Sequence, residues 1–358
     1  VVPGRHPLSI GDRIGSYYHG FPGFIDQVRI SNGVLEFRPA AFQFAPERTS
    51  FVRMEKAPDF ELSVRNLQKT PLQGAQVRIS VAGVNEQPFA VPSLASWASH
   101  ALRYAVDTAL RPGSYALKAR LEIPGEHAFR SEEEFAFVIV PRPPPHRMPV
   151  IMWGIGQGAV LKEIPLLKEI GFTHCLGLGA DFGAIWEAGK PTLAGRPESV
   201  GDAKRGLNEA LANDIGIVAQ LSPGHWLAER KDLQRVARKG QPYKRNDVNA
   251  ALPGLAEFCQ NVGASVAQTY DAFPAFQAAL IDTEVRDGSQ VSFSAFDHEQ
   301  YRKVSGQDIP AEVSGKNGVD WHKLKDFPAD RVISDDHPLL QFYRWFWTVG
   351  DGWNGLHS

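Results

Sequence analysis

A run of prolines at residues 141–146, PRPPPH, divides the chain into two parts with different sequence patterns. Before it, short alternating runs such as FELSVRN and AQVRISVAG are separated by turn clusters, which is typical of a β-sandwich. After it, apolar strand-like runs alternate with segments whose apolar residues recur at helical spacing. Because a proline run is a stiff spacer without N–H donors for a sheet, we place a linker at residues 143–148. A sandwich at 47–142 precedes it and an α/β domain at 149–358 follows.

Charge and cysteine content favour some kinds of partner over others. Lys and Arg number 38 against 40 Asp and Glu, for a net charge of −2, so nothing favours nucleic acid as a partner and a neutral substrate fits better. No apolar stretch is long enough to cross a bilayer, so we expect no membrane insertion. Cys175 and Cys259 lie in apolar periodic segments, which predicts buried free thiols. We expect no metal and no organic cofactor, and the oligomeric state stays open.

The N-terminal half resembles two known β-domains. The segment GFIDQVRISNGVL, residues 23–35, is similar to the closing strands of laminin-G-like, concanavalin-type jelly rolls, so we assign residues 1–46 to the end of such a domain. Residues 47–142 resemble the immunoglobulin-like domains that precede the catalytic domains of many secreted carbohydrate-active enzymes. The chain begins in a strand pattern and stops just after a helical one, which predicts a longer natural protein.

Four units of strand and helix follow the linker. Their strand segments are PVIMWGIG at 149–156, THCLGLGAD at 173–181, IVAQLSPG at 217–224 and QAALIDTEV at 277–285. Such units predict a parallel sheet, either half of a (β/α)₈ barrel or a doubly wound sheet. No strand is followed by a nucleotide-binding glycine pattern, and each ends in polar or aromatic residues, as a barrel active site requires. The predicted fold is therefore multidomain, with all-β sandwich domains followed by the first half of an α/β TIM barrel.

The fourth strand carries the candidate catalytic residues. Asp282, Glu284 and Arg286 lie on one face of an extended chain, with the α carbons of the two acids roughly 6.6 Å apart. Each carboxylate opposes ionisation of the other, so one can stay protonated, as a glycosidase acid must. We predict Glu284 as the acid and Asp282 as a tuning or positioning group. The alternative is a structural strand end in which Arg286 neutralises Glu284.

Other strand ends supply candidate substrate-binding residues. Indole rings there can stack on sugars, although core packing is an equal alternative for each of them. Asn and Asp before a helical run are as often helix caps as ligands of hydroxyl, sulfate or carboxylate groups. The predicted binding residues are Trp153, Asp181, Trp186, His225, Trp226, Arg245, Asn246 and Arg286.

An apolar fourth strand ending in glutamate resembles the clan A glycoside hydrolases, including β-galactosidase-like families. The resemblance implies Glu284 as acid/base and a nucleophile beyond Ser358, although Thr283 stands where those families have asparagine. DTE at 282–284 is also similar to the end of the chitinase-like motif, which implies substrate-assisted hydrolysis. The main prediction is thus a secreted or periplasmic glycoside hydrolase that cleaves a poly- or oligosaccharide substrate by a retaining mechanism. The alternatives are a chitinase-like hydrolase and a non-catalytic carbohydrate-binding or scaffold protein.

Overall fold

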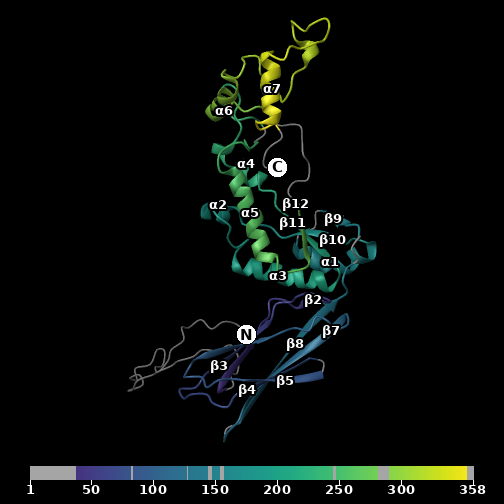
Figure 1. Cartoon of the computed structure of the whole chain (residues 1–358), viewed down its shortest axis with the longest axis vertical. Helices are drawn as coiled ribbons and strands as arrows, with labels where there is room; N and C mark the ends of the chain where they lie inside the picture. Colours follow the sequence, from purple (N-terminus) through teal and green to yellow (C-terminus); the bar gives the residue numbers. More distant parts are fainter. Residues whose placement is uncertain are drawn as a thin grey trace, which may run out of the picture.

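Two β-sheets form the N-terminal part of the protein in the computed structural model (Figure 1). The structure describes residues 38–81, 84–126, 128–143, 147–153, 157–244, 247–280 and 290–352. The three-stranded sheet has the order β1 (Ala40–Phe44), β3 (Phe60–Asn66), β6 (Ser99–Tyr104). The five-stranded sheet has the order β2 (Ser50–Val52), β8 (Phe129–Val140), β7 (Gly113–Ile123), β4 (Gln76–Val81), β5 (Val84–Ala90).

Alternation of apolar and polar residues explains this sandwich. In β3, Phe60, Leu62 and Val64 are buried while Glu61 and Arg65 are exposed, so one face of the strand packs into the core and the other meets water. The predicted immunoglobulin-like β-sandwich is confirmed as a sandwich of two sheets. Residues 1–37 lie outside the described part of the chain, and residues 40–44, which we had placed before the sandwich, form β1 and pair with β3.

A four-stranded parallel sheet follows the proline-rich segment. Its order is β9-β10-β11-β12, which is also the order along the chain. The two inner strands, β10 and β11, are largely buried. Helix α1 precedes β10 in the chain, α3 follows β10 and α5 follows β11, and all three helices share the apolar core of the sheet. The elements are β9 (Ile151–Met152), α1 (Gln157–Ile170), β10 (His174–Gly177), α2 (Phe182–Ala188), α3 (Pro197–Ala212), β11 (Gly216–Gln220), α4 (Gly224–Ala228), α5 (Leu255–Tyr270) and β12 (Phe276–Leu280).

The half-barrel prediction is wrong. The four strands exist in the expected order, but in the described residues they form a short open sheet whose edge strands are β9 and β12. Among the described strands, β9 pairs with β10 alone, and its Ile151 is 40% exposed. Successive strand and helix units occur equally in open sheets and barrels, and only the tilt and closure of the strands separate the two. Sequence periodicity contains no information on closure, which explains the error.

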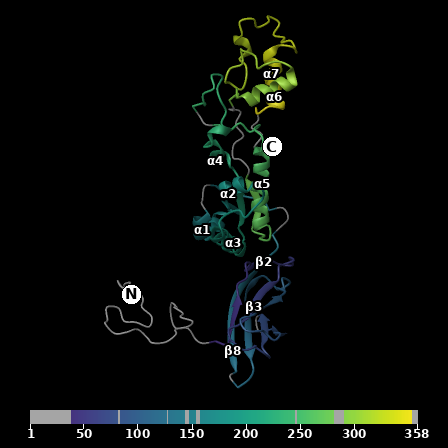
Figure 2. The same cartoon turned by 90° about the vertical axis from the view of Figure 1, so that its left-hand side faces the viewer.

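The last described segment, residues 290–352, is helical and has its own apolar core. It contains α6 (Ala295–Ser305), η2 (Trp321–Lys323) and α7 (Pro338–Thr348), and Figure 2 shows α6 and α7 beyond the end of α5 that lies away from the sandwich. Tyr301 of α6 packs edge to face against Phe342 and Trp345 of α7. None of the helices in the described ranges is long and apolar enough to cross a membrane.

Two polar connections hold these parts together. Asn208 on α3 accepts a hydrogen bond from Thr49 N at 2.8 Å and donates one to Glu47 O at 2.7 Å, which links the α/β part to the sandwich. Arg235 forms an ion pair with Asp351 at 2.5 Å, and neither side chain is more than 5% exposed. Its Nε also donates to Val248 O and its Nη1 to Gln290 O. One buried guanidinium therefore connects the loop at Val248 with both ends of the helical segment.

Asn208→Ala should lower the free energy of unfolding by about 1–3 kcal/mol, because it leaves a backbone N–H and a carbonyl at a buried interface without their partner. Urea denaturation monitored by circular dichroism measures the change. Asn213→Ala is the matched control, since Asn213 bonds only within its own helix end at Glu209. Equal effects of the two substitutions would contradict a linking role for Asn208.

Arg235→Met should cost about 3–5 kcal/mol, because it leaves the Asp351 carboxylate buried without its cation. Arg235→Lys should restore little of this stability, since one ammonium cannot reach all the acceptors that the guanidinium fork serves. The control is Arg205→Met, which removes an exposed ion pair with Asp202 and should change stability by less than about 1 kcal/mol. Chemical denaturation measures the free energy of unfolding of each variant. Equal stability of Arg235→Met and Arg205→Met would contradict a stabilising role for the buried Arg235 ion pair.

Both cysteines should resist thiol reagents in the folded protein. Cys175 is fully buried, and burial raises the pKa of its thiol to about 11; burial also raises the pKa of Cys259. The folded pKa of the Cys175 thiol exceeds the value of about 8.5 for an unfolded thiol. The protonated Cys175 thiol therefore contributes to the stability of the folded state in full below about pH 8.5, and this contribution is lost as pH rises through about 11. A colorimetric thiol assay at pH 8 should show slow reaction in buffer and fast reaction in denaturant. Fast native labelling of Cys175 would contradict its burial.

Candidate functional site

The carboxyl ends of the parallel strands meet at one edge of the sheet, and several of the predicted site residues follow them. In open parallel sheets, this edge is where ligands bind. Trp153 follows β9 and is 53% exposed. Asp181 follows β10, and α4 after β11 contains His225 and Trp226. Asp282, Glu284, Arg286, Arg245 and Asn246 lie outside the described residues, so their predicted roles stay predictions.

Asp181 has a local structural role at this edge. Its carboxylate accepts a hydrogen bond from Ala184 N at 3.0 Å and caps the N-terminus of α2. An aspartate at this position satisfies a free helix N–H and suits the positive end of the helix dipole. The side chain is nevertheless exposed, as is His225 on α4. Both groups can therefore still contact a bound molecule from the side.

Four side chains form a cluster above this edge, which we call the Trp-Arg cluster: Trp186, Trp226, Phe258 and Arg230. The ring centroids of Trp186 and Trp226 are 5.8 Å apart, and each lies within 5.5 Å of the Phe258 ring. Phe258 is buried in α5, whereas the two indoles are partly exposed. The indoles thus pack against one another on one side, which is the core-packing alternative, and keep some surface open to solvent.

Arg230 completes the cluster by stacking on both indoles. Its guanidinium carbon lies 4.5 Å from the Trp186 ring centroid and 5.2 Å from that of Trp226. Both separations are within the range of favourable cation–π interactions. Burial leaves the Arg230 Nε without any hydrogen-bond partner in the described structure. The sequence patterns did not predict this residue, because Arg230 lies between α4 and η1 and outside any helical periodicity.

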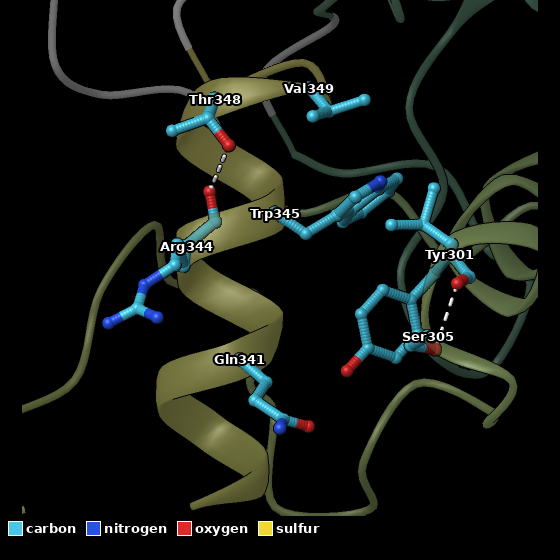
Figure 3. Close-up of a pocket in the computed structure, with 8 residues that line it drawn as sticks. Tyr301, Ser305, Gln341, Arg344, Trp345, Thr348 and Val349 are labelled. Atoms are coloured by element: carbon cyan, nitrogen blue, oxygen red, sulfur yellow. Dashed lines mark hydrogen bonds between the residues drawn. The ribbon is translucent and has the colours of Figure 1, made fainter. Parts of the chain in front are cut away.

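A pocket of about 370 Å³ lies between α6 and α7, away from this edge (Figure 3). Trp345 forms part of its wall, and the Trp345 Nε1 is buried without a partner in the part of the chain that the structure describes. In Figure 3 the Arg344 guanidinium points away from the Trp345 ring, and it pairs with Asp335. Burial raises the pKa of Tyr301. The pocket therefore offers no pair of facing ionisable groups for acid/base chemistry.

No protein-family model and no curated protein matches the chain. Among solved structures, it is similar to the CARDB domain of a Pyrococcus furiosus protein at 16% identity, covering 29% of this chain and 92% of that one, with a TM-score of 0.24. It is similar to a PapD-like domain of human CEP192 at 14% identity, covering 32% and 97%, with a TM-score of 0.18. A cycloisomaltooligosaccharide glucanotransferase of Paenibacillus sp. matches at 9% identity, covering 63% and 36%, with a TM-score of 0.22.

The prediction of a clan A-like glycoside hydrolase is wrong, whereas the predicted laminin-G-like end at residues 1–46 lies mostly outside the described residues. No protein-family model, of a glycoside hydrolase or of any other family, matches the chain. The sheet that suggested the barrel is open in the described residues. The motif behind the resemblance was an apolar strand followed by acids, a pattern that strand ends of many folds share. What holds is a multidomain protein with a β-sandwich.

Proposed function

We propose that the protein is a non-catalytic scaffold that binds carbohydrate at the carboxyl edge of its parallel sheet. The observation that carries this proposal is the pair of partly exposed indoles in the Trp-Arg cluster, Trp186 and Trp226, which come from two different helices. Indole faces and edges offer the apolar surface on which the C–H groups of sugar rings pack. Contact with Phe258 fixes both rings in place. A fixed ring loses little conformational entropy when a ligand binds.

The surroundings of the cluster suit a hydroxyl-rich ligand. The exposed Asp181 carboxylate and His225 ring come from the two helices that supply the indoles, and both can exchange hydrogen bonds with hydroxyl groups. Trp153 offers a further exposed ring after β9. The sandwich supports this arrangement through Asn208 and the ion pair between Lys204 and Glu47. A rigid support of this kind is what a scaffold contributes to a binding site.

Hydrolysis of a glycosidic bond with Glu284 as the acid stays a prediction, as does a secreted or periplasmic location. Incubating the protein with a panel of polysaccharides and measuring reducing ends tests the first. The non-catalytic proposal expects no release above background from the wild type or from Glu284→Gln. If the wild type releases reducing ends and Glu284→Gln does not, the non-catalytic proposal is wrong and the protein is an enzyme.

Isothermal titration calorimetry with a panel of oligosaccharides tests binding itself. We expect Trp226→Ala to weaken binding about tenfold or more, and Trp153→Ala about 3- to 10-fold, because each loses one aromatic contact. Trp97→Ala is the matched control, since Trp97 is 45% exposed but lies in the sandwich. Thermal unfolding of each variant shows whether the fold survives. Absence of binding by the wild type at millimolar ligand would remove the proposal.

A further inference from the structure

Three arginines lie within nine residues of one another after β11, and their surroundings differ. Arg235 is buried and donates hydrogen bonds to Val248 O and Asp351 O in addition to its ion pair. Arg238 donates to Val313 O and Pro310 O and stacks on Phe293. The donors of both groups are thus used within the protein. These two residues have the contacts expected of structural arginines.

Arg230 differs from both. Within the described ranges, its guanidinium stacks on the rings of Trp186 and Trp226 and forms no ion pair. Its Nε is buried without a hydrogen-bond partner. A guanidinium has five N–H donors in one plane, and leaving them unused in a partly buried site is costly. The two indoles hold this cation in a fixed orientation at the edge of the sheet without neutralising it.

We propose that Arg230 is an anion-recognition group, and that the glycan bound at the Trp-Arg cluster carries a carboxylate or a sulfate. This inference rests on the proposed carbohydrate-binding function and specifies its ligand. A planar guanidinium matches the two oxygens of a carboxylate or sulfate with parallel hydrogen bonds, whereas a neutral hydroxyl uses one donor at a time. The partly buried position raises the strength of a charge-assisted hydrogen bond relative to an exposed one.

The indoles of Trp186 and Trp226 orient the Arg230 guanidinium for the anion. Stacking restricts the guanidinium to one plane, so less side-chain entropy is lost when the anion binds. The outer surface of the same rings remains for the apolar face of the sugar. An acidic sugar presents both features within one residue, because its charged group is attached to a ring with an apolar C–H surface. A simple anion would use Arg230 but not the rings.

The experiment compares acidic and neutral glycans of matched length by calorimetry with the full chain. The probes are oligogalacturonate for the carboxylate, a sulfated galactan oligosaccharide for the sulfate, and neutral galacto-oligosaccharide as reference. Arg230→Met keeps an apolar stem between the indoles and removes all donors. Arg230→Lys keeps the charge but loses the planar fork. Lys231→Met is the control, because it removes one exposed charge from the adjacent position.

We expect the wild type to bind at least one acidic glycan about tenfold or more tightly than the neutral one. Arg230→Met should weaken acidic binding about 10- to 100-fold and leave neutral binding within about twofold, the range expected for losing hydrogen bonds to a charged group. Arg230→Lys should recover only part of the loss, and Lys231→Met should resemble the wild type. Which acidic probe binds identifies carboxylate or sulfate as the ligand group.

Other outcomes separate the two proposals. Equal binding of acidic and neutral glycans, or an Arg230→Met variant that keeps the acidic preference, overturns anion recognition and leaves the carbohydrate-binding scaffold standing. Absence of binding to every glycan removes both. A change in tryptophan fluorescence during titration reports on Trp186 and Trp226 where Trp186→Phe and Trp226→Phe remove it, because the chain has 8 tryptophans. Melting curves show that Arg230→Met is folded. A folded variant with unchanged fluorescence response and unchanged affinity would also overturn the role of Arg230.

Discussion

The buried ion pair between Arg235 and Asp351 is the constraint on which the distal part of the structure depends. It joins the loop after α4 to the end of the helical segment, and the same guanidinium donates to Gln290 O at the start of that segment. Asp351 Oδ2 in turn accepts from Ala250 N at 2.9 Å. Two buried charges carry a large desolvation cost, which is offset here because nearly every donor and acceptor is satisfied.

A second buried group strengthens the same connection. Asn249 donates to the Asp297 carboxylate, which also accepts from Ser294 in the capping box of α6. The loop between η1 (Lys231–Leu233) and α5 is therefore fixed on both sides. Arg230 lies immediately before η1, and its carbonyl accepts a hydrogen bond from Leu233 N at 3.0 Å. The polar network thus fixes the backbone that carries Arg230, while the indoles of α2 and α4 fix its side chain.

Asn208 holds the opposite end of the α/β part. Its amide bonds two backbone groups of the sandwich, so α3 and the segment before β2 behave as one support. Together, Asn208 and Arg235 place the parallel sheet between two fixed neighbours. A short sheet of four strands with exposed edges gains rigidity from this arrangement, because isolated small sheets bury too little apolar surface to be stable alone.

Much of the fold could be predicted from local sequence patterns. Alternation in Phe60–Asn66 predicts a half-buried strand, and the four apolar runs after the prolines predict parallel strands, all of which are present. Local patterns also place Trp153, Asp181, His225 and Trp226 after strands. Closure of a barrel could not be predicted this way, because it depends on pairing between distant strands, and the predicted half barrel is absent from the described residues.

The sequence by itself determined the secondary-structure types, the division at the prolines and the residue types at the strand ends, because these follow from periodicity and backbone chemistry. Only the tertiary structure decided which side chains meet. Trp186 and Trp226 are 40 residues apart and Phe258 a further 32, so their contact depends on how α2, α4 and α5 pack. In the described residues, the same packing leaves the Arg230 Nε without a hydrogen-bond partner, while the Arg235 Nε donates to Val248 O. Two arginines of identical chemistry thus acquire different roles through their three-dimensional surroundings alone.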